Sequence, residues 1–244
     1  MPPERDLRAP MNTRDSIFSL LAASSQFADL DPMALRTVAA GCRSKIFPAD
    51  QMVFMEGDPC RSLYILESGR VNFFRTNAEG REQILKVFEC PGDMFCIASA
   101  FNTKIHIVSA KVVTETRLHL LDMEAVNSLA REHPSVGLKI VGMAGEQMTH
   151  LVGLADDLSL KTAAGRLAKY LYELAVAQGA GKGVEVRIPR DRLRAEELAS
   201  KLGTVRVHIS RSLTGLAAAG AIEVDRRFIR IRDIAILKRF FEGK

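Results

Sequence analysis

The sequence lacks any run of 18 apolar residues, so no segment can cross a bilayer as a helix. Its first 15 residues, MPPERDLRAPMNTRD, contain no apolar stretch and do not form a secretory signal peptide. We expect residues 1–14 to be a flexible tail, with translation starting at Met1 or Met11. We also expect the protein to be cytoplasmic. Disulfides are rare in that compartment, so its four cysteines are expected to be free thiols.

The motifs of several enzyme classes are also missing. There is no Walker loop and no G-x-S-x-G, and none of the five histidines stands in an HxH or HxxH arrangement. A cupin-like enzyme would need clustered histidine and carboxylate ligands, so an enzyme is not expected. The cysteines lack the close spacing of iron–sulfur ligands, which argues against such a cluster: they are Cys42, Cys60, Cys90 and Cys96.

Charge is distributed unevenly along the chain. Residues 161–244 hold 18 Lys/Arg and 9 Asp/Glu, a net charge of +9, whereas residues 1–160 hold 16 and 20, a net charge of −4. A basic C-terminal third behind a slightly acidic body is typical of a DNA-binding domain attached to another domain. An ordinary solvated surface is the plainer alternative.

Residues 194–216 have the pattern of two short helices joined by a turn at Gly203. In a helix-turn-helix the second helix enters the DNA major groove. The opposite, polar face of the second helix carries Arg206, His208, Ser210 and Arg211. A helical hairpin in a protein-interaction module that does not bind DNA is the alternative. Apolar residues recur at helical spacing on both sides of the turn: Leu193, Leu198, Leu202, Val205, Ile209, Leu213 and Leu216.

Residues 221–232 alternate apolar and charged side chains around Asp225-Arg226-Arg227, which predicts a two-stranded hairpin. Gly220 is placed to end the preceding helix. A hairpin directly after a recognition helix is the wing of a winged helix. We therefore expect Arg226 and Arg227, at its tip, to contact DNA phosphates.

The N-terminal half changes from a helical to a strand pattern. Residues 15–41 are predicted to form helices, and short alternating runs separated by turns follow. Many short strands with a turn every 8–12 residues favour a sandwich or jelly-roll barrel. The predicted strands cover residues 45–47, 52–55, 62–66, 70–75, 83–88, 104–109, 111–114 and 117–121.

Helical spacing returns after residue 122. Apolar and small residues starting at Gly137 repeat at 4-3-4-3-4 spacing, which is typical of a coiled-coil seam. A second row, at Ile140, Met143 and Leu154, is available to pack on the barrel. The seam predicts a homodimer whose interface consists of Val141, Ala144, Met148, Leu151 and Ala155.

Several short motifs, in this order and spacing, resemble the Crp/Fnr family of dimeric bacterial transcription regulators. They include Gly57-Asp58, residues 63–69 (LYILESG), residues 91–95 (PGDMF), residues 164–168 (AGRLA) and residues 203–213. The resemblance implies an α+β protein: a tail (1–14), a cyclic-nucleotide-binding-type jelly-roll sensor (15–133), a long dimerisation helix (134–157) and a winged helix-turn-helix domain (158–244). It also implies a near-palindromic DNA site and contact with RNA polymerase.

The resemblance assigns the DNA contacts to the recognition helix. Arg206 and Arg211 match two arginines that commonly touch bases in the family, and Arg binds guanine O6 and N7 in bidentate fashion. Val207 stands where the family commonly has Glu, and His208 where it commonly has Thr. The expected DNA-contacting residues of this helix are Thr204, Arg206, Val207, His208, Ser210 and Arg211.

The same resemblance argues against cyclic AMP as the effector. Ile97 stands where family members that bind it have a ribose-binding Glu, and Ile107 or Val108 where they have a phosphate-binding Arg. Leu151 and Val152 replace a Thr-Ser pair that meets the adenine. The replacements predict a pocket for an apolar ligand, lined by Phe95, Cys96, Ile97, Ile107, Leu151 and Val152.

Haem is a further candidate cofactor. Residues 92–96 (GDMFC) are similar to the carbon-monoxide-sensing haem regulators, although Ala98 replaces a histidine found there. Cys96 and His106, with Pro2 near the N-terminus, are the candidate iron ligands, and His119 is a further strand histidine. The alternatives are buried packing for Cys96 and satisfied strand histidines for the other two.

Overall fold

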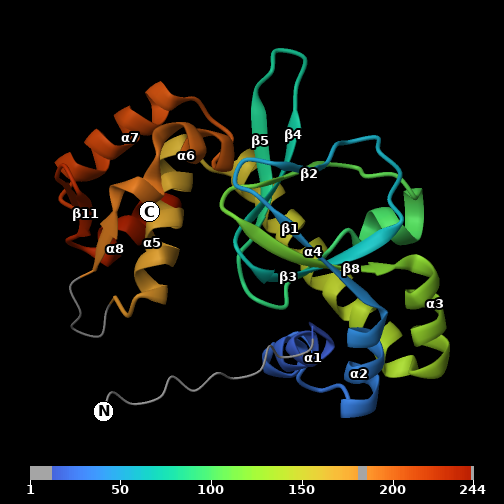
Figure 1. Ribbon diagram of the computed structural model, residues 1–244. Helices are drawn as coiled ribbons and strands as arrows, with labels where there is room; N and C mark the ends of the chain where they lie inside the picture. Colours follow the sequence, from blue (N-terminus) through green and yellow to red (C-terminus); the bar gives the residue numbers. More distant parts are fainter. Residues whose placement is uncertain (1–12, 181–185, 243–244) are drawn as a thin grey trace, which may run out of the picture. The chain divides into compact units, whose positions relative to one another are not determined.

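The structure is a computed structural model that describes residues 13–180 and 186–242. The chain divides into two compact units (Figure 1). The first contains the described residues up to 74 and residues 86–149; the second contains residues 75–85 and the described residues from 150 onward. Most of the predicted tail lies outside the described residues. Its last two residues, Thr13 and Arg14, begin helix α1 (Thr13–Ala23), so the predicted tail was too long.

Two four-stranded sheets form the predicted barrel, with strand orders β1-β8-β3-β6 and β2-β7-β4-β5. The pairs β1–β8, β3–β8, β3–β6, β2–β7 and β4–β7 are antiparallel. The strands are β1 (Cys42–Phe47), β2 (Met52–Phe54), β3 (Ser62–Ser68), β4 (Val71–Thr76), β5 (Glu82–Phe88), β6 (Met94–Phe95), β7 (Ser109–Val112) and β8 (Thr116–Asp122).

Apolar side chains of the central strands form the barrel core. Leu63, Ile65 and Leu66 of β3 and Leu118 of β8 are completely buried. The turn after β3 requires glycine: Gly69 has φ +100°, and a Cβ there would lie 2.3 Å from Thr116 Oγ1. The Ser68-Gly69 motif therefore marks a place where β3 must turn tightly against the start of β8.

Helices flank the barrel in the first unit. α1 packs on α2 (Pro32–Gly41), which begins with Asp31 as N-cap and leads directly into β1. α3 (Met123–Glu132) follows β8 and packs against it. The long helix α4 (Pro134–Leu160) starts with Pro134 and buries Ile140 and Met143 against the barrel core. None of the described helices is long and apolar enough to cross a membrane.

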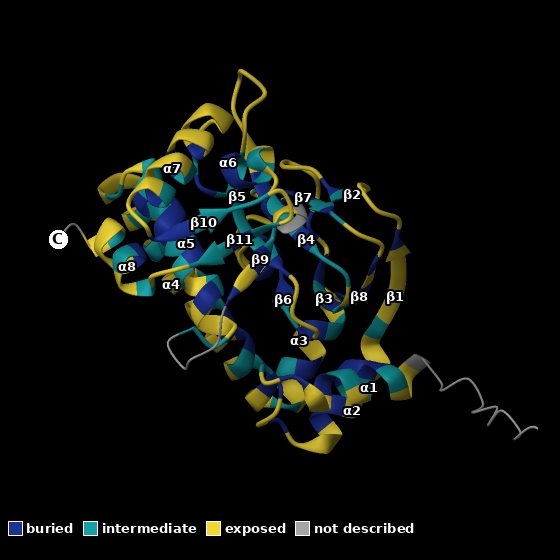
Figure 2. Cartoon of the chain, turned by 90° about the vertical axis from the view of Figure 1, so that its left-hand side faces the viewer, coloured by how far each residue is buried: buried dark blue, intermediate teal, exposed yellow. Residues whose placement is uncertain are grey.

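The second unit is a winged helix around its own core (Figure 2). Its sheet has the order β10-β11-β9, and buried Leu167, Leu171, Ile209 and Leu216 hold the helices together. The predicted α+β class and its domain types are confirmed. The elements are α5 (Ala163–Ala177), β9 (Arg187–Pro189), a short 3-10 helix (Arg190–Leu193), α6 (Ala195–Lys201), α7 (Arg206–Ala218), β10 (Ile222–Val224), β11 (Phe228–Ile231) and α8 (Ile234–Glu242).

The predicted strand at residues 104–109 was wrong. A π-helix, Ser99–Thr103, occupies the preceding segment, and Lys104 turns the chain with φ +57°. Ile105 forms an isolated bridge to Pro59, and Ser109 is already the first residue of β7, where it pairs with Phe74. Side chains do alternate between the two faces here, but the isoleucines lie on the exposed face. Ile105 and Ile107 are exposed, whereas His106 is 2% exposed. The short strands β6 and β9 were not predicted.

Candidate functional site

The helix-turn-helix turn is fixed by the side chain of Arg166. Its Nε donates to Leu202 O (2.6 Å), its Nη2 to Gly203 O (3.2 Å) and its Nη1 to Lys161 O (2.6 Å). Gly203 has φ +61°, which glycine adopts without steric cost. Arg166 therefore ties the turn after α6 to Lys161, the residue that follows α4. Sequence reasoning missed this role of the arginine in the AGRLA segment.

Helix α7 presents a polar face to solvent. Ile209 and Leu216 are completely buried on its inner face. The outer face carries Arg206, Val207, His208, Ser210 and Arg211, all exposed. A Schellman motif ends the helix: the Ala221 amide donates to Leu216 O at 3.0 Å, and Gly220 has φ +75°.

Arg206 is held by an ion pair. Its Nη1 lies 2.9 Å from Glu196 Oε1 of α6, and both side chains are about 70% exposed. An ion pair this exposed contributes little stability, so the guanidinium can exchange it for a base. Because Glu196 precedes the turn, it directs Arg206 toward the N-terminal end of the recognition helix.

Two expectations for this helix need correction. Thr204 is 7% exposed, its amide donates to Ala199 O, and its Oγ1 lies 3.2 Å from His208 Nδ1. It therefore positions His208 and is not itself presented to DNA. Val205, expected in the core, is the N-cap residue of α7 and is 43% exposed. The inner position is taken instead by Ser212, which is 8% exposed.

The wing ends in an exposed basic turn. Asp225 Oδ1 accepts hydrogen bonds from the amides of Arg227 (2.6 Å) and Phe228 (2.7 Å), which lower the pKa of that carboxyl. The turn leaves the side chains of Arg226 and Arg227 exposed. Both residues lie where the sequence placed them, at the tip between β10 and β11.

Replacing Arg226 by alanine is expected to weaken binding to all DNA sequences equally. A contact to phosphate carries no sequence information, and each lost contact removes about one released counterion per subunit from the salt dependence. Affinities measured at several salt concentrations, on a specific and a random duplex, test this. A change confined to the specific duplex would contradict the assignment.

Helix α4 carries an exposed apolar stripe. Val141 is 68% exposed, Met148 69% and Leu151 50%. Ala144 is half-buried and Ala155 is exposed. The other apolar row behaves differently: Ile140 and Met143 are each 4% exposed and Leu154 is half-buried. Uncovered apolar side chains on one helix face are typical of an interaction surface.

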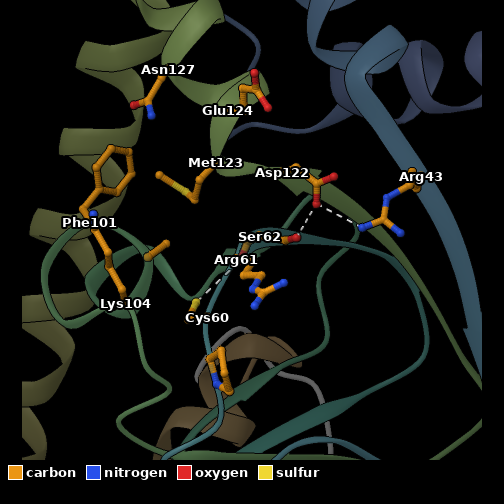
Figure 3. A pocket seen from close by; sticks show the side chains of 12 residues that line it. Arg43, Cys60, Arg61, Ser62, Phe101, Lys104, Asp122, Met123, Glu124 and Asn127 are labelled. Carbon is orange, nitrogen blue, oxygen red and sulfur yellow. Dashed lines mark hydrogen bonds and ion pairs between the residues drawn. The ribbon is translucent and has the colours of Figure 1, made fainter.

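The first unit contains a pocket of about 830 Å³ whose walls combine charged and apolar side chains (Figure 3). Its Asp122 accepts hydrogen bonds from Ser62 Oγ (2.6 Å) and Arg43 Nη2 (3.0 Å), which lower the pKa of that carboxyl. None of the residues predicted to line an effector pocket lies here. The lining residues are Arg43, Pro59, Cys60, Arg61, Ser62, Ala100, Phe101, Lys104, Asp122, Met123, Glu124 and Asn127.

The predicted apolar pocket is not formed as expected. Ile107, Leu151 and Val152 are exposed, at 43%, 50% and 56%. Phe95 is buried and packs against Phe73 and Phe88, with ring centroids 4.9–5.2 Å away. Phe95 is therefore part of the packed core of the first unit, among other aromatic rings. Cys96 and Ile97 are buried, as expected for lining residues, but beside these rings.

Two cysteines and a histidine meet between the pocket and the core. Cys60, Cys96 and His106 are buried, and their Sγ, Sγ and Nδ1 atoms all lie within 4.8 Å of one another. The contact from the Cys96 thiol, aided by His106, lowers the pKa of Cys60 to about 5, whereas burial raises the pKa of Cys96 well above its usual value. The sequence had identified Cys96 and His106 but not Cys60.

His119 is a buried histidine of strand β8. Its Nε2 lies 2.8 Å from Glu67 Oε2 and its Nδ1 2.9 Å from Ser44 Oγ. Burial lowers the pKa of His119, and Glu67 opposes that shift. Ser44 and Glu67 therefore lie beside the two ring nitrogens of His119.

Comparisons with known proteins agree with this architecture. Residues 44–133 match the cyclic nucleotide-binding domain family, and residues 165–240 match the Crp-like helix-turn-helix domain family. The second match covers α6, α7 and the wing. It supports DNA binding over the alternative of an interaction module.

Named relatives extend over nearly the whole chain. A CRP-like cAMP-activated global transcriptional regulator of Mycobacterium tuberculosis is 30% identical, over 90% of this chain and 97% of its own length. The cyclic AMP receptor protein of Thermus thermophilus is 28% identical, over 91% and 99%. A CooA mutant from Carboxydothermus hydrogenoformans shares the fold, with a TM-score of 0.70 and 21% identity over 96% of this chain and 98% of that one. This chain belongs to the Crp/Fnr family of DNA-binding transcription regulators, and it is not an enzyme.

Proposed function

We propose that the protein regulates transcription as a homodimer that binds a near-palindromic DNA site under control of a small effector. The observation that carries the DNA-binding part is the exposed face of α7, with Arg206 and Arg211, beside a basic wing tip. Arginines on that face reach base edges, while those of the wing reach phosphates. Selection of bound duplexes from a random pool tests the proposal, and recovery of asymmetric sites would contradict it.

The homodimer is supported by the exposed stripe of α4. Val141, Met148 and Leu151 recur at 7- and 3-residue steps, the spacing of a coiled-coil seam. Two copies related by a two-fold axis would cover each other's stripes, because the same patch serves both subunits. Two recognition helices about 34 Å apart would then meet successive major grooves, so half-sites should lie about 10 base pairs apart, centre to centre. Recruitment of RNA polymerase is proposed from family membership.

We propose that the effector is not cyclic AMP. Two relatives are named for cyclic AMP, but residues 96–108 of this chain (CIASAFNTKIHIV) contain no carboxylate and no arginine. A ribose hydroxyl would find no acidic partner in this segment, and Ile97 is buried while Ile107 is exposed. A phosphate diester without a cationic partner at that place would lose its hydration uncompensated.

Calorimetric titration with cyclic AMP is expected to show no binding in the micromolar range. The reason is the missing acidic and cationic partners at Ile97 and Ile107. A control titration should use a family member that responds to cyclic AMP. A micromolar dissociation constant for this protein would refute the proposal and would mean that other residues hold the nucleotide.

We propose that haem is not the effector. The Phe54 ring stacks on the imidazole of His106, with centroids 3.5 Å apart and planes 8° apart. Cys96 Sγ lies 3.7 Å from His106 Nδ1. A porphyrin beside either candidate ligand would have to displace these contacts. We therefore propose that the effector occupies the pocket of the first unit that Cys60 lines.

A further inference from the structure

We propose that Cys60, Cys96 and His106 form a binding site for a zinc-type divalent metal ion inside the barrel. The three residues stand far apart in the sequence and come from three segments: the end of the 57–60 turn, the residue after β6, and the loop before β7. Thiolate and imidazole are the ligands that zinc prefers. A site of this kind is independent of the DNA-binding surface.

The distances suit such an ion. With Zn–S of about 2.3 Å and Zn–N of about 2.0 Å, tetrahedral coordination separates a sulfur from a nitrogen ligand by roughly 3.5 Å and two sulfurs by roughly 3.8 Å. Cys96 Sγ and His106 Nδ1 are 3.7 Å apart, and all three ligand atoms lie within 4.8 Å of one another. Small side-chain rotations are enough to surround an ion.

The backbone holds the ligands in place. The His106 amide donates to Asp58 O (2.8 Å), the Gly57 amide to His106 O (2.8 Å) and the Cys60 amide to Lys104 O (2.9 Å). These bonds tie the segment of Cys60 to the segment of His106. Stacking on Phe54 fixes the plane of the imidazole. Ligands held in advance bind an ion with less loss of conformational freedom.

The conformation of Cys96 also points to a constrained role. Its φ is +71°, in the left-handed region that glycine adopts most readily. A residue with a side chain adopts this conformation only at a steric cost. In this conformation the Sγ atom of Cys96 lies 3.7 Å from Nδ1 of His106. Residues held in such conformations are concentrated at functional sites.

Charge balance favours a divalent ion over a monovalent one. Cys60, Cys96 and His106 are 4%, 5% and 2% exposed, so a net charge in the site would be poorly solvated. Two thiolates and a neutral imidazole neutralise Zn²⁺, whereas Cu⁺ would leave a net charge of −1. Binding releases the remaining thiol protons to solvent, and no electrons are transferred because zinc is not redox-active.

Access and an open coordination position are both provided by the pocket. Cys60 lies in its wall (Figure 3). Three protein ligands leave the fourth tetrahedral position open, as in zinc sites that exchange a water or a substrate. A water or a small ligand from the pocket can take that position.

A hydrogen bond connects the site with α4. Gln147 Nε2 of α4 donates to Met94 O at 2.9 Å, two residues before Cys96. Ion binding that moves Cys96 would therefore also move the Met94 carbonyl, which is hydrogen-bonded to Gln147 of α4. Control of DNA binding by this route rests on the proposed function, but the metal site itself does not.

The test is titration of the reduced, metal-free protein with Co²⁺ as a spectroscopic probe, followed by displacement with Zn²⁺. Wild type should show thiolate-to-cobalt charge-transfer bands and the strong visible bands of tetrahedral Co²⁺, at one ion per chain. Cys60→Ser, Cys96→Ser and His106→Gln should each weaken binding about 100-fold or more. Cys42→Ser and Cys90→Ser are the matched controls and should match wild type.

Equal spectra in wild type and Cys96→Ser would overturn the site, as would binding of Cu⁺ without Co²⁺ or Zn²⁺, or a Soret band on haem addition. If the ligand variants fail to fold, the melting temperature is the second readout. Zn²⁺ should then raise the melting temperature of wild type and of Cys90→Ser equally. An unchanged melting temperature of wild type would overturn the site. Zn²⁺ binding without any change in DNA affinity would overturn only the coupling.

Discussion

Replacing Met148 and Leu151 together by glutamate is expected to split the dimer and to reduce DNA affinity to that of a single half-site. Both side chains are at least half exposed in the subunit, so its fold should tolerate the change. In a two-fold dimer the four carboxylates would face one another away from water, a large penalty. Sedimentation at micromolar concentration and a mobility-shift titration measure the two effects.

Thr149→Glu is the control: it adds one carboxylate per subunit, half the charge of the double variant, at an exposed position on a neighbouring side of α4. It should remain dimeric, and both proteins should keep the helical circular-dichroism signal of wild type. A wild-type protein that sediments as a monomer while binding DNA fully would show that the stripe serves another partner.

Arg206→Ala is expected to weaken binding by about 1–3 kcal/mol for each half-site and to relax preference at one base pair in it. The substitution removes the guanidinium and with it the expected bidentate contact to a base edge. The hydrogen-bond acceptors of that base are then left without a partner. Because both subunits of the dimer change, the losses combine. Affinity for a selected site, and selection repeated with the variant, measure the effect.

Two controls separate base contact from charge. Lys238→Ala removes one exposed positive charge from α8 of the same unit and should change affinity little. Glu196→Gln frees Arg206 from its 2.9 Å ion pair and should keep the same preferred base. An identical consensus for wild type and Arg206→Ala would rule out Arg206 as a base-contacting residue.

The helical and strand periodicities predicted most of the fold. Leu198, Ile209 and Leu216 are buried as the apolar spacing predicted, because a short helix buries only one face, whereas Val205 is exposed and Ser212 is buried. The wing was predicted from alternation around Asp225. The strand at 104–109 failed although its alternation was real, since period two states that alternate side chains share a face but not which face is buried.

The residues of the candidate sites also differ in how far the sequence predicted them. The DNA-binding residues were predictable because they lie on one short helix and one turn, where spacing in the sequence fixes spacing in the molecule. Arg226 and Arg227 are exposed as expected. Thr204 was misplaced because its hydroxyl contacts His208, a local contact that the helical pattern does not include.

By itself, the sequence determined the order of the elements, the family, the charge of the DNA-binding unit and the stripe on α4, all of which depend on local periodicity and composition. The tertiary structure alone decided that Phe95 packs with Phe73 and Phe88. It also brought Cys60 to Cys96 and His106. Those contacts join segments separated by tens of residues, and they exist only once the barrel closes and sets the register of its strands.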